Sequence, residues 1–392
     1  MHIAFVSTQF MSANLVGGLG NYLLRAGLAL REMAHHPTIF MIADDDNEED
    51  FRGIRLISVA GKRHSPAARL LHGDLHANEY HSRLLNRAVR RVHQETPIDI
   101  VQFTNYRATA LHRAQEIPSV IRVSSYRPFW DRFHPTAGQS RSRRRAARLE
   151  KAAFYKADAV YSPSQVLADA ISKDLQIDVA VIEPPFIMDA EELDPSPMKE
   201  ATHGEPFFLY AGHLTQRKGA LVLRDALNRI LSEYPTHRFV FVGRTDIKGE
   251  RISPDILLAA AGEHSDRVTF LGTLKHEALY PFYRDADAVI LPSIIDNIAN
   301  TGLEAMAMGA IVVGTDGGSF EQLIEEGCSG FLCAPEDPDS LLDAVRRAMR
   351  IDTDEAARLR SAAQKRIKEL RPERTIAQLV DFYKKVIAKE GR

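Results

Sequence analysis

Short apolar runs alternate with longer amphipathic stretches along the whole chain. Val, Ile, Phe and Tyr dominate the runs, as buried strands require. One intervening stretch, residues 219–234, places Leu223, Leu227, Ile230 and Leu231 on one helical face. This pattern predicts an α/β fold with helices on parallel sheets. The predicted strands form two series, residues 2–7, 38–42, 98–103, 120–123 and 159–162, then 207–211, 239–243, 268–272, 288–292 and 311–314.

One segment, residues 183–206, breaks this alternation. It contains five prolines and seven acidic residues, a composition typical of a linker and surface loop. The break separates two domains of similar size, residues 1–188 and the part that follows. Because ligands of such sheets bind at the carboxyl ends of the strands, we expect the functional site in a cleft between the two domains.

Composition and charge exclude several classes of protein. No run approaches the roughly 20 apolar residues of a membrane-spanning helix. The N-terminus lacks the pattern of a secretory signal, and Cys328 and Cys333 cannot form a disulfide framework, so we expect a cytoplasmic protein. The net charge of −2 argues against a bulk nucleic-acid binder. Up to position 188 there are 24 basic and 19 acidic residues, and after it 26 and 33, so the first part is mildly basic.

The first candidate motif is Gly17-Gly18-Leu19-Gly20-Asn21, between the first strand and an apolar helix. Glycine lets a ligand approach the backbone closely, and a helix N-terminus favours an anion. The spacing differs from the GxGxxG dinucleotide fingerprint, so a simple flexible turn is an open alternative.

The second motif, residues 212–219, directly follows the strand at 207–211. Arg217 and Lys218 stand just before a helix, a position that suits a diphosphate, with His213 nearby. A solvated basic turn is the alternative.

The third motif, residues 292–309, runs from a strand into a helix and carries Asp296 and, eight residues later, Glu304. The Asn/Thr/Gly-rich turn between them can direct several N–H groups at one anion, and the carboxylates can accept hydrogen bonds from sugar hydroxyls. Two acids that cap a helix are the alternative.

The third motif resembles the E-x7-E signature of retaining GT-B glycosyltransferases of glycosyltransferase family 4, with Asp in place of the first Glu. The resemblance extends over nearly the whole chain, through Gly17-Gly18-x-Gly20, Lys218-Gly219 and many shorter matches. The other matches include Leu149-Glu150, Ser162-Pro163-Ser164, Tyr210-Ala211-Gly212, Ala286-Asp287-Ala288 and Gly314-Thr315-Asp316-Gly317-Gly318-Ser319.

This resemblance implies a GT-B fold of two Rossmann-like domains facing a central cleft. Residues 1–188 would form the acceptor-side domain and residues 189–372 the nucleotide-sugar domain. The last helix, residues 373–392, would pack back on the N-terminal domain.

The resemblance also implies roles for individual residues. Lys218 would contact the donor diphosphate, Glu304 the ribose, and Asp296 would lie near the donor sugar. Further donor-binding positions are Gly17, Gly18, Gly20 and His213, the base neighbours Thr273 and Leu274, and the phosphate-binding residues Ile298, Ala299, Asn300 and Thr301.

The sequence departs from the family at two further places. The family usually has Gly-Arg before the lysine, whereas this chain has Gly212-His213, so Arg217 or His213 would supply the charge. The family often has a His after the strand at 120–123, where Ser124 or Ser125 stands here.

The implied reaction is metal-independent transfer with retention from a nucleoside-diphosphate sugar of UDP or GDP type. The acceptor would be a glycan, a lipid-linked or a small molecule. We expect no cofactor and no metal, because Lys218, Arg217 and a helix N-terminus would stabilise the leaving diphosphate. A sugar-nucleotide epimerase of similar fold and a catalytically altered nucleotide-sugar-binding protein are the alternatives.

A basic stretch and an aromatic cluster lie on the acceptor side. Arg144 belongs to an arginine-rich helix start, which is either simply solvated or contacts an anionic acceptor or the inner membrane face. Trp130, the one tryptophan, lines an acceptor groove or belongs to the core.

Overall fold

The computed structural model divides the chain into two units. Residues Met1–Ile187 and Leu370–Arg392 form the N-terminal unit, and Met188–Glu369 form the C-terminal unit. The structure describes residues 1–8, 18–61, 77–131, 141–188, 193–245 and 252–390. No helix among these residues is both long enough and apolar enough to span a membrane.

The N-terminal unit is built on a sheet with the strand order β3-β4-β2-β1-β5-β6-β7-β8. Its strands are β1 (His2–Val6), β2 (His36–Ala43), β3 (Asn47–Phe51), β4 (Ile54–Ala60), β5 (Ile100–Thr104), β6 (Ser119–Arg122), β7 (Ala159–Ser162) and β8 (Val179–Val181). Its helices are α1 (Gly18–Glu32), α3 (Ala77–Glu95), η1 (Tyr106–Ala108), α4 (Arg127–Trp130), α5 (Arg141–Phe154), α6 (Gln165–Leu175) and α14 (Pro372–Glu390). The pairing is parallel except at β3 and β4.

The antiparallel hairpin of β3 and β4 is an element that the hydrophobic pattern did not predict. β3 has the sequence Asn-Glu-Glu-Asp-Phe and is almost entirely exposed at the sheet edge. Acidic side chains on an edge strand discourage pairing with another chain. Arg52 and Gly53 both have positive φ, as a tight hairpin turn requires.

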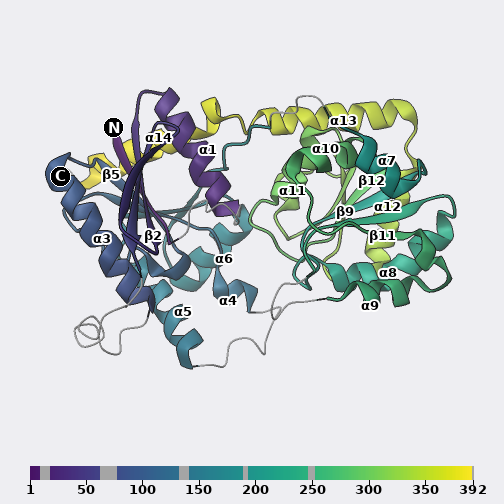
Figure 1. Cartoon of the computed structure of the whole chain (residues 1–392), viewed down its shortest axis with the longest axis horizontal. Helices are drawn as coiled ribbons and strands as arrows, with labels where there is room; N and C mark the ends of the chain where they lie inside the picture. The colour runs from purple at the N-terminus through teal and green to yellow at the C-terminus, as the bar shows by residue number, and fades with distance from the viewer. Residues whose placement is uncertain (9–17, 62–76, 132–140, 189–192, 246–251, 391–392) are drawn as a thin grey trace. The chain divides into compact units, whose positions relative to one another are not determined.

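Helix α14 returns from the end of the chain to the N-terminal sheet. Ile376, Leu379 and Tyr383 pack with α1 in the apolar core of this unit. The backbone N–H of Phe186 donates to the carbonyl of Leu370 at 2.8 Å, which ties the two chain segments where they join the unit. Figure 1 shows α14, in yellow, beside α1.

The C-terminal unit is built on a parallel sheet with the order β11-β10-β9-β12-β13-β14. Its strands are β9 (Phe207–Ala211), β10 (Arg238–Val242), β11 (Val268–Phe270), β12 (Ala288–Leu291), β13 (Val312–Thr315) and β14 (Phe331–Cys333). Its helices are α7 (Ser196–Thr202), α8 (Ala220–Glu233), α9 (Pro254–Ala261), η3 (Gly262–Arg267), α10 (His276–Asp285), α11 (Asn300–Ala307), η4 (Phe320–Gln322), α12 (Pro338–Arg350) and α13 (Thr353–Lys368).

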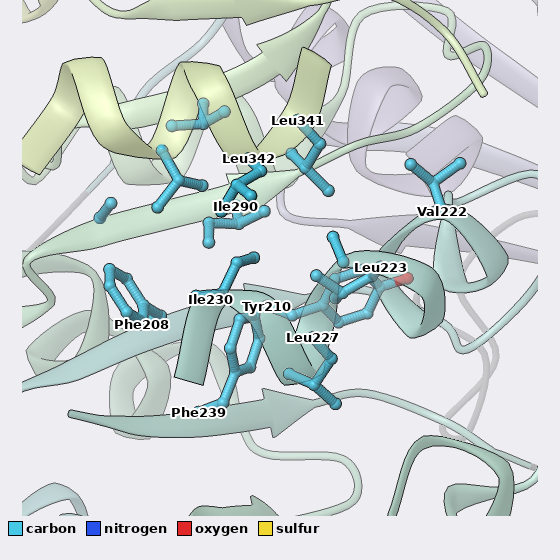
Figure 2. Packing of buried hydrophobic residues seen from close by; sticks show 14 of the residues in the cluster. Phe208, Tyr210, Val222, Leu223, Leu227, Ile230, Phe239, Ile290, Leu341 and Leu342 are labelled. Atoms are coloured by element: carbon cyan, nitrogen blue, oxygen red, sulfur yellow. The ribbon is translucent and has the colours of Figure 1, made fainter. Parts of the chain in front are cut away.

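Apolar side chains on one face of the sheet pack with helices α8, α9 and α12 in a core of the C-terminal unit. Leu223, Leu227 and Ile230 of α8 are fully buried and pack against the strands, as the helical periodicity predicted. Figure 2 shows them beside Phe208 and Phe239, with Leu342 of α12 near Ile290.

The prediction that residues 183–206 form a linker and loop needs one correction. Residues Ser196–Thr202 form helix α7, with Met198 and Thr202 buried. Pro197 is compatible with this helix because proline lacks only an N–H that would be unbonded in the first turn. The prolines therefore indicate where a helix begins, and not only a loop.

Candidate functional site

The candidate site lies where the chain reverses its direction across the C-terminal sheet. β9 has β10 on one side and β12 on the other, so the loops that follow β9 and β12 begin at adjacent strand ends. Such a switch point is the usual place for a ligand in an open α/β sheet. The second and third sequence motifs occupy these two loops.

The loop after β9 is held in a defined shape by the strand that leads into it. Tyr210 donates its hydroxyl proton toward two carbonyls of this loop, at 2.8 Å to His213 and 3.2 Å to Lys218. Burial, and secondarily the carboxylate of Asp296, raise the pKa of Tyr210 well above its usual range, so the hydroxyl stays a donor. Tyr210 belongs to one of the family matches but had no predicted role, because its position in a strand indicates only a core residue.

Gly219 allows the two loops to pack closely. It has a φ of +77°, and a Cβ at this position would lie 1.8 Å from the carbonyl oxygen of Pro292. Only glycine fits so close an approach without a backbone shift. The backbone N–H of Ile294 then donates to the carbonyl of Arg217 at 2.9 Å, joining the loops directly.

This packing brings Lys218 and Asp296 together. The Nζ of Lys218 donates to Oδ2 of Asp296 in an ion pair whose side chains are 20% and 18% exposed. A partly buried pair is screened by salt less than a surface pair. The sequence separated these residues by 78 positions, and the fold places them in contact.

The third motif continues from Asp296 into helix α11. The backbone N–H of Asp296 donates to the carbonyl of Gly318 at 2.9 Å, and Ile298 adopts a φ of +62°. The N–H of Ile298 donates to the hydroxyl of Ser319 at 3.2 Å. Ala299 stands at the N-cap position of α11, and its methyl side chain has no oxygen that could accept from the first turn. The first backbone N–H groups of α11, those of Asn300 and Thr301, can therefore donate to another acceptor.

Glu304 lies one turn into α11 and is only 3% exposed. Its Oε2 accepts a hydrogen bond from the hydroxyl of Tyr283 on α10 at 3.4 Å. Burial, reinforced by Glu304, raises the pKa of Tyr283 well above its usual range, so the phenol stays protonated beside the carboxylate. No sequence pattern pointed to Tyr283, because a helical tyrosine at that position is typical of a core.

The predicted base-binding residues lie on a more distant strand end. Thr273 is exposed and Leu274 half-buried, just after β11, which is separated from β9 by β10. The ends of these three strands are nevertheless linked. The N–H of Gly212 donates to the carbonyl of Val242, and the N–H of Gly243 to that of Gly272, at 2.8 and 2.7 Å.

The other predicted residues belong to the N-terminal unit. Gly17 lies outside the described residues, Gly18 is the first residue of α1, and Gly20 is buried. Ser124 and Ser125 follow β6 and are both half-buried.

Asn105, which the sequence did not single out, fixes the position of Ser124. Its Oδ1 accepts from the N–H of Ser124 at 2.8 Å and from the Ser124 hydroxyl at 3.0 Å. Trp130 is half-buried on α4, and Arg144 is exposed on α5. The structure thus leaves Arg144 on the surface, whereas Ser124 is held in a hydrogen-bonded turn.

Two family profiles match the two halves of the chain. The profile of glycosyltransferase family 4 matches residues 16–187, and that of glycosyl transferases group 1 matches residues 196–366. The chain belongs to glycosyltransferase family 4. The family was thus predicted correctly from the three motifs, and these matches favour a transferase over the epimerase alternative.

Curated family members are similar to parts of the chain. The similarity is 30% identity over 145 residues for an uncharacterized glycosyltransferase of Methanocaldococcus jannaschii and 32% over 180 residues for the D-inositol 3-phosphate glycosyltransferase of Corynebacterium urealyticum. A glycogen synthase of Mycobacterium tuberculosis is 33% identical over 165 residues. These matches cover 37%, 45% and 41% of this chain, and 36%, 42% and 38% of the relatives' own lengths.

Solved structures support the fold over the whole chain. Sucrose-phosphate synthase from Thermosynechococcus elongatus aligns with a TM-score of 0.74 at 20% identity, covering 99% of each chain. A glycosyltransferase from Rickettsia africae aligns with a TM-score of 0.69 at 17% identity, covering 98% of each. This family member therefore has the GT-B fold that the resemblance implied.

Proposed function

We propose that this family 4 member transfers a glycosyl group from a nucleoside-diphosphate sugar, of UDP or GDP type, to a glycan, lipid-linked or small-molecule acceptor. The observation that carries the proposal is the contact of Lys218 with Asp296 at the switch point of the C-terminal sheet. A cation held there by a neighbouring carboxylate is positioned to meet a diphosphate.

The reaction is transfer with retention of configuration. The bond between the anomeric carbon and the diphosphate oxygen breaks as a bond to the acceptor oxygen forms on the same face of the sugar. The acceptor proton passes to the departing phosphate oxygen. Positive charge develops on the sugar ring, and negative charge grows on the leaving diphosphate.

The residues of the C-terminal unit take separate roles in this proposal. Lys218, with Arg217, stabilises the leaving diphosphate, and the first amides of α11 bind its distal phosphate without a metal. Asp296 keeps the Lys218 ammonium in place. Glu304, buried beside Tyr283, accepts the ribose hydroxyls.

The experiment is a two-stage measurement on the full chain. Isothermal titration calorimetry with UDP, GDP and ADP identifies the base of the nucleotide that binds. Thermal unfolding gives an independent check, because a ligand at 100 times its dissociation constant should raise the free energy of unfolding by about 2.7 kcal/mol. NMR of the product formed from the matching sugar nucleotide, with and without EDTA, then reports the anomeric configuration and the metal requirement.

The outcomes separate the parts of the proposal. An inverted product would refute retention, and activity lost on chelation and restored by Mg²⁺ or Mn²⁺ would refute the metal-free site. Failure of all three nucleotides to bind would refute the donor class.

A further inference from the structure

Arg122, the last residue of β6, is a buried arginine at the carboxyl end of the N-terminal sheet. It is only 6% exposed. Val120, two residues earlier on the same strand, packs in the core that α1 and α14 cover, so Arg122 faces the same side of the sheet. Its guanidinium carbon lies 3.7 Å from the centre of the Tyr22 ring on α1.

The charge of Arg122 has no counterion among the described residues. No carboxylate pairs with its guanidinium there, and its Nε is buried without a hydrogen-bond partner. The hydroxyls nearby are neutral, because burial raises the pKa of Tyr161 and Tyr383 well above their usual range. Burying a charge without a partner destabilises the folded protein. Stacking on the Tyr22 ring offsets only part of that cost.

Two further polar groups on the same face also lack partners. Thr104 is the register partner of Arg122 on β5, and its hydroxyl is buried without a hydrogen bond to a described residue. Gln102, two residues before Thr104, accepts from the hydroxyls of Tyr161 at 2.6 Å and Tyr383 at 2.5 Å, while its amide nitrogen lacks a partner. All three unsatisfied groups can donate, so the missing partner is an acceptor of hydrogen bonds.

Helix α1 adds a further source of positive potential. It is 15 residues long, and Tyr22, the residue under the guanidinium, lies little more than one turn from its N-terminus. A helix N-terminus attracts anions within its first turn. β5 lies beside β1, and β6 is the next strand after β5, so Arg122 is close to the switch point of the sheet, where ligands of such folds bind.

We propose that Arg122 anchors a site for a phosphate group at the carboxyl edge of the N-terminal sheet. Donors from a guanidinium and a hydroxyl match the several oxygens of a phosphate better than the two of a carboxylate. Under the proposed function, on which this assignment rests, the phosphate belongs to the acceptor and is not the donor diphosphate.

The test is thermal unfolding of the full chain in inorganic phosphate, with potassium chloride at equal ionic strength and acetate as controls. Phosphate should raise the melting temperature of the wild type, and chloride and acetate should raise it less. Arg122→Met should abolish the phosphate effect. Without phosphate it should unfold no more easily than the wild type, because it removes an unpaired buried charge.

Two further variants keep the test decisive. Arg122→Lys retains the positive charge but loses the planar guanidinium, whose N–H groups can donate to two phosphate oxygens at once. Phosphate binding measured by calorimetry should therefore weaken at least tenfold. Arg87→Met removes an exposed arginine from α3 and should leave the phosphate effect intact. No phosphate effect in the wild type, or an equal effect in Arg122→Met, would overturn the proposal.

Nucleotide titration separates this inference from the proposed function. Arg122→Met should bind the nucleoside diphosphate as the wild type does, and phosphate should not displace the nucleotide. Loss of nucleotide binding in Arg122→Met alone would assign Arg122 to the donor and overturn the acceptor assignment. Absence of nucleotide binding in both proteins, with the phosphate effect intact, would refute the donor class and leave the phosphate site.

Discussion

The carboxyl edges of the two sheets hold their cations in opposite ways. In the C-terminal unit, Lys218 is paired with Asp296, and both side chains are about one-fifth exposed. In the N-terminal unit, Arg122 is more deeply buried and has no carboxylate partner within the described residues. One edge therefore carries an ion pair, and the other carries a buried cation without a carboxylate partner among the described residues.

The difference teaches how each edge can respond to an anion. The Lys218 ammonium is already paired, so under the proposed function a diphosphate would share Lys218 with Asp296, and Asp296 would position the lysine. Arg122 has lost much of its hydration and is compensated only by stacking on Tyr22, so an anion there would relieve a cost already present in the folded protein.

The largest expected effect comes from removing the cation of the Lys218–Asp296 ion pair. Lys218→Ala should lower kcat by on the order of 10²-fold or more, because the leaving diphosphate gains charge in the transition state. Steady-state kinetics with one donor measures this. Wild-type kcat/KM in the variant would show that the diphosphate does not bind at residues 212–219.

Two neighbours of Lys218 serve as matched comparisons. Arg217→Ala should reduce kcat less than Lys218→Ala if it only supports the lysine, and by a similar factor if it replaces the absent family arginine. If His213 is the substitute, its removal should matter most below a pH of about 6.5, where imidazole is charged.

The second prediction concerns the buried carboxylate of the C-terminal unit. Glu304→Ala should weaken nucleoside-diphosphate binding by about 1.5–3 kcal/mol, because ribose hydroxyls would be buried without a partner. Calorimetry on the folded variant measures the change. Tyr283→Phe, which removes only the phenol hydroxyl that Glu304 accepts from, should change affinity much less, and unchanged affinity in Glu304→Ala would refute the ribose role.

The third prediction compares hydroxyls that brace each unit. Tyr383→Phe removes one of the hydroxyls that donate to the Gln102 side chain. This variant should lower the free energy of unfolding by about 1 kcal/mol without changing nucleotide affinity. Tyr210→Phe removes the hydrogen bonds from the Tyr210 hydroxyl to the carbonyls of His213 and Lys218. This variant should lower both the free energy of unfolding and the nucleotide affinity. Denaturant unfolding with calorimetry tests this, and equal affinity losses in the two variants would contradict the division of roles.

The smallest expected effect is a pH dependence in the N-terminal unit. Burial lowers the pKa of His2, whose ring nitrogens lie 3.1 Å from the carbonyl oxygen of Pro97 and 2.9 Å from the Thr38 hydroxyl oxygen. Because the folded protein keeps His2 neutral to a lower pH than the unfolded chain does, the unfolded chain binds the proton first. The contribution of neutral His2 to the free energy of unfolding is therefore fully present above a pH of about 6.5, the unfolded-state pKa, and is lost as pH falls below it. Unfolding of the wild type and His2→Gln between pH 7.5 and 5 should show a shallower decline in the variant.

Much of the fold could be predicted from local pattern. The strand at 159–162 and the strand at 207–211 agree with β7 and β9, because buried β-branched and aromatic runs have few other stable conformations. β3 could not be predicted, because its Glu and Asp side chains face solvent and its partner supplies the hydrogen bonds. Helix α7 was not predicted, because the prolines at its start are equally typical of a loop.

By itself, the sequence determined the family and the residue types at the candidate site, because loop length and glycine placement are local properties of the chain. Only the tertiary structure decided which of these residues meet. Lys218 and Asp296 pair because the strand order makes β9 and β12 neighbours. Arg122 has no counterion among the described residues because the residues around it come from β5, β7, α1 and α14; Gln102 and Tyr383, for example, are 281 positions apart in the chain. The charge balance at a buried edge depends on all of these neighbours together, and that balance is fixed only when the chain has folded.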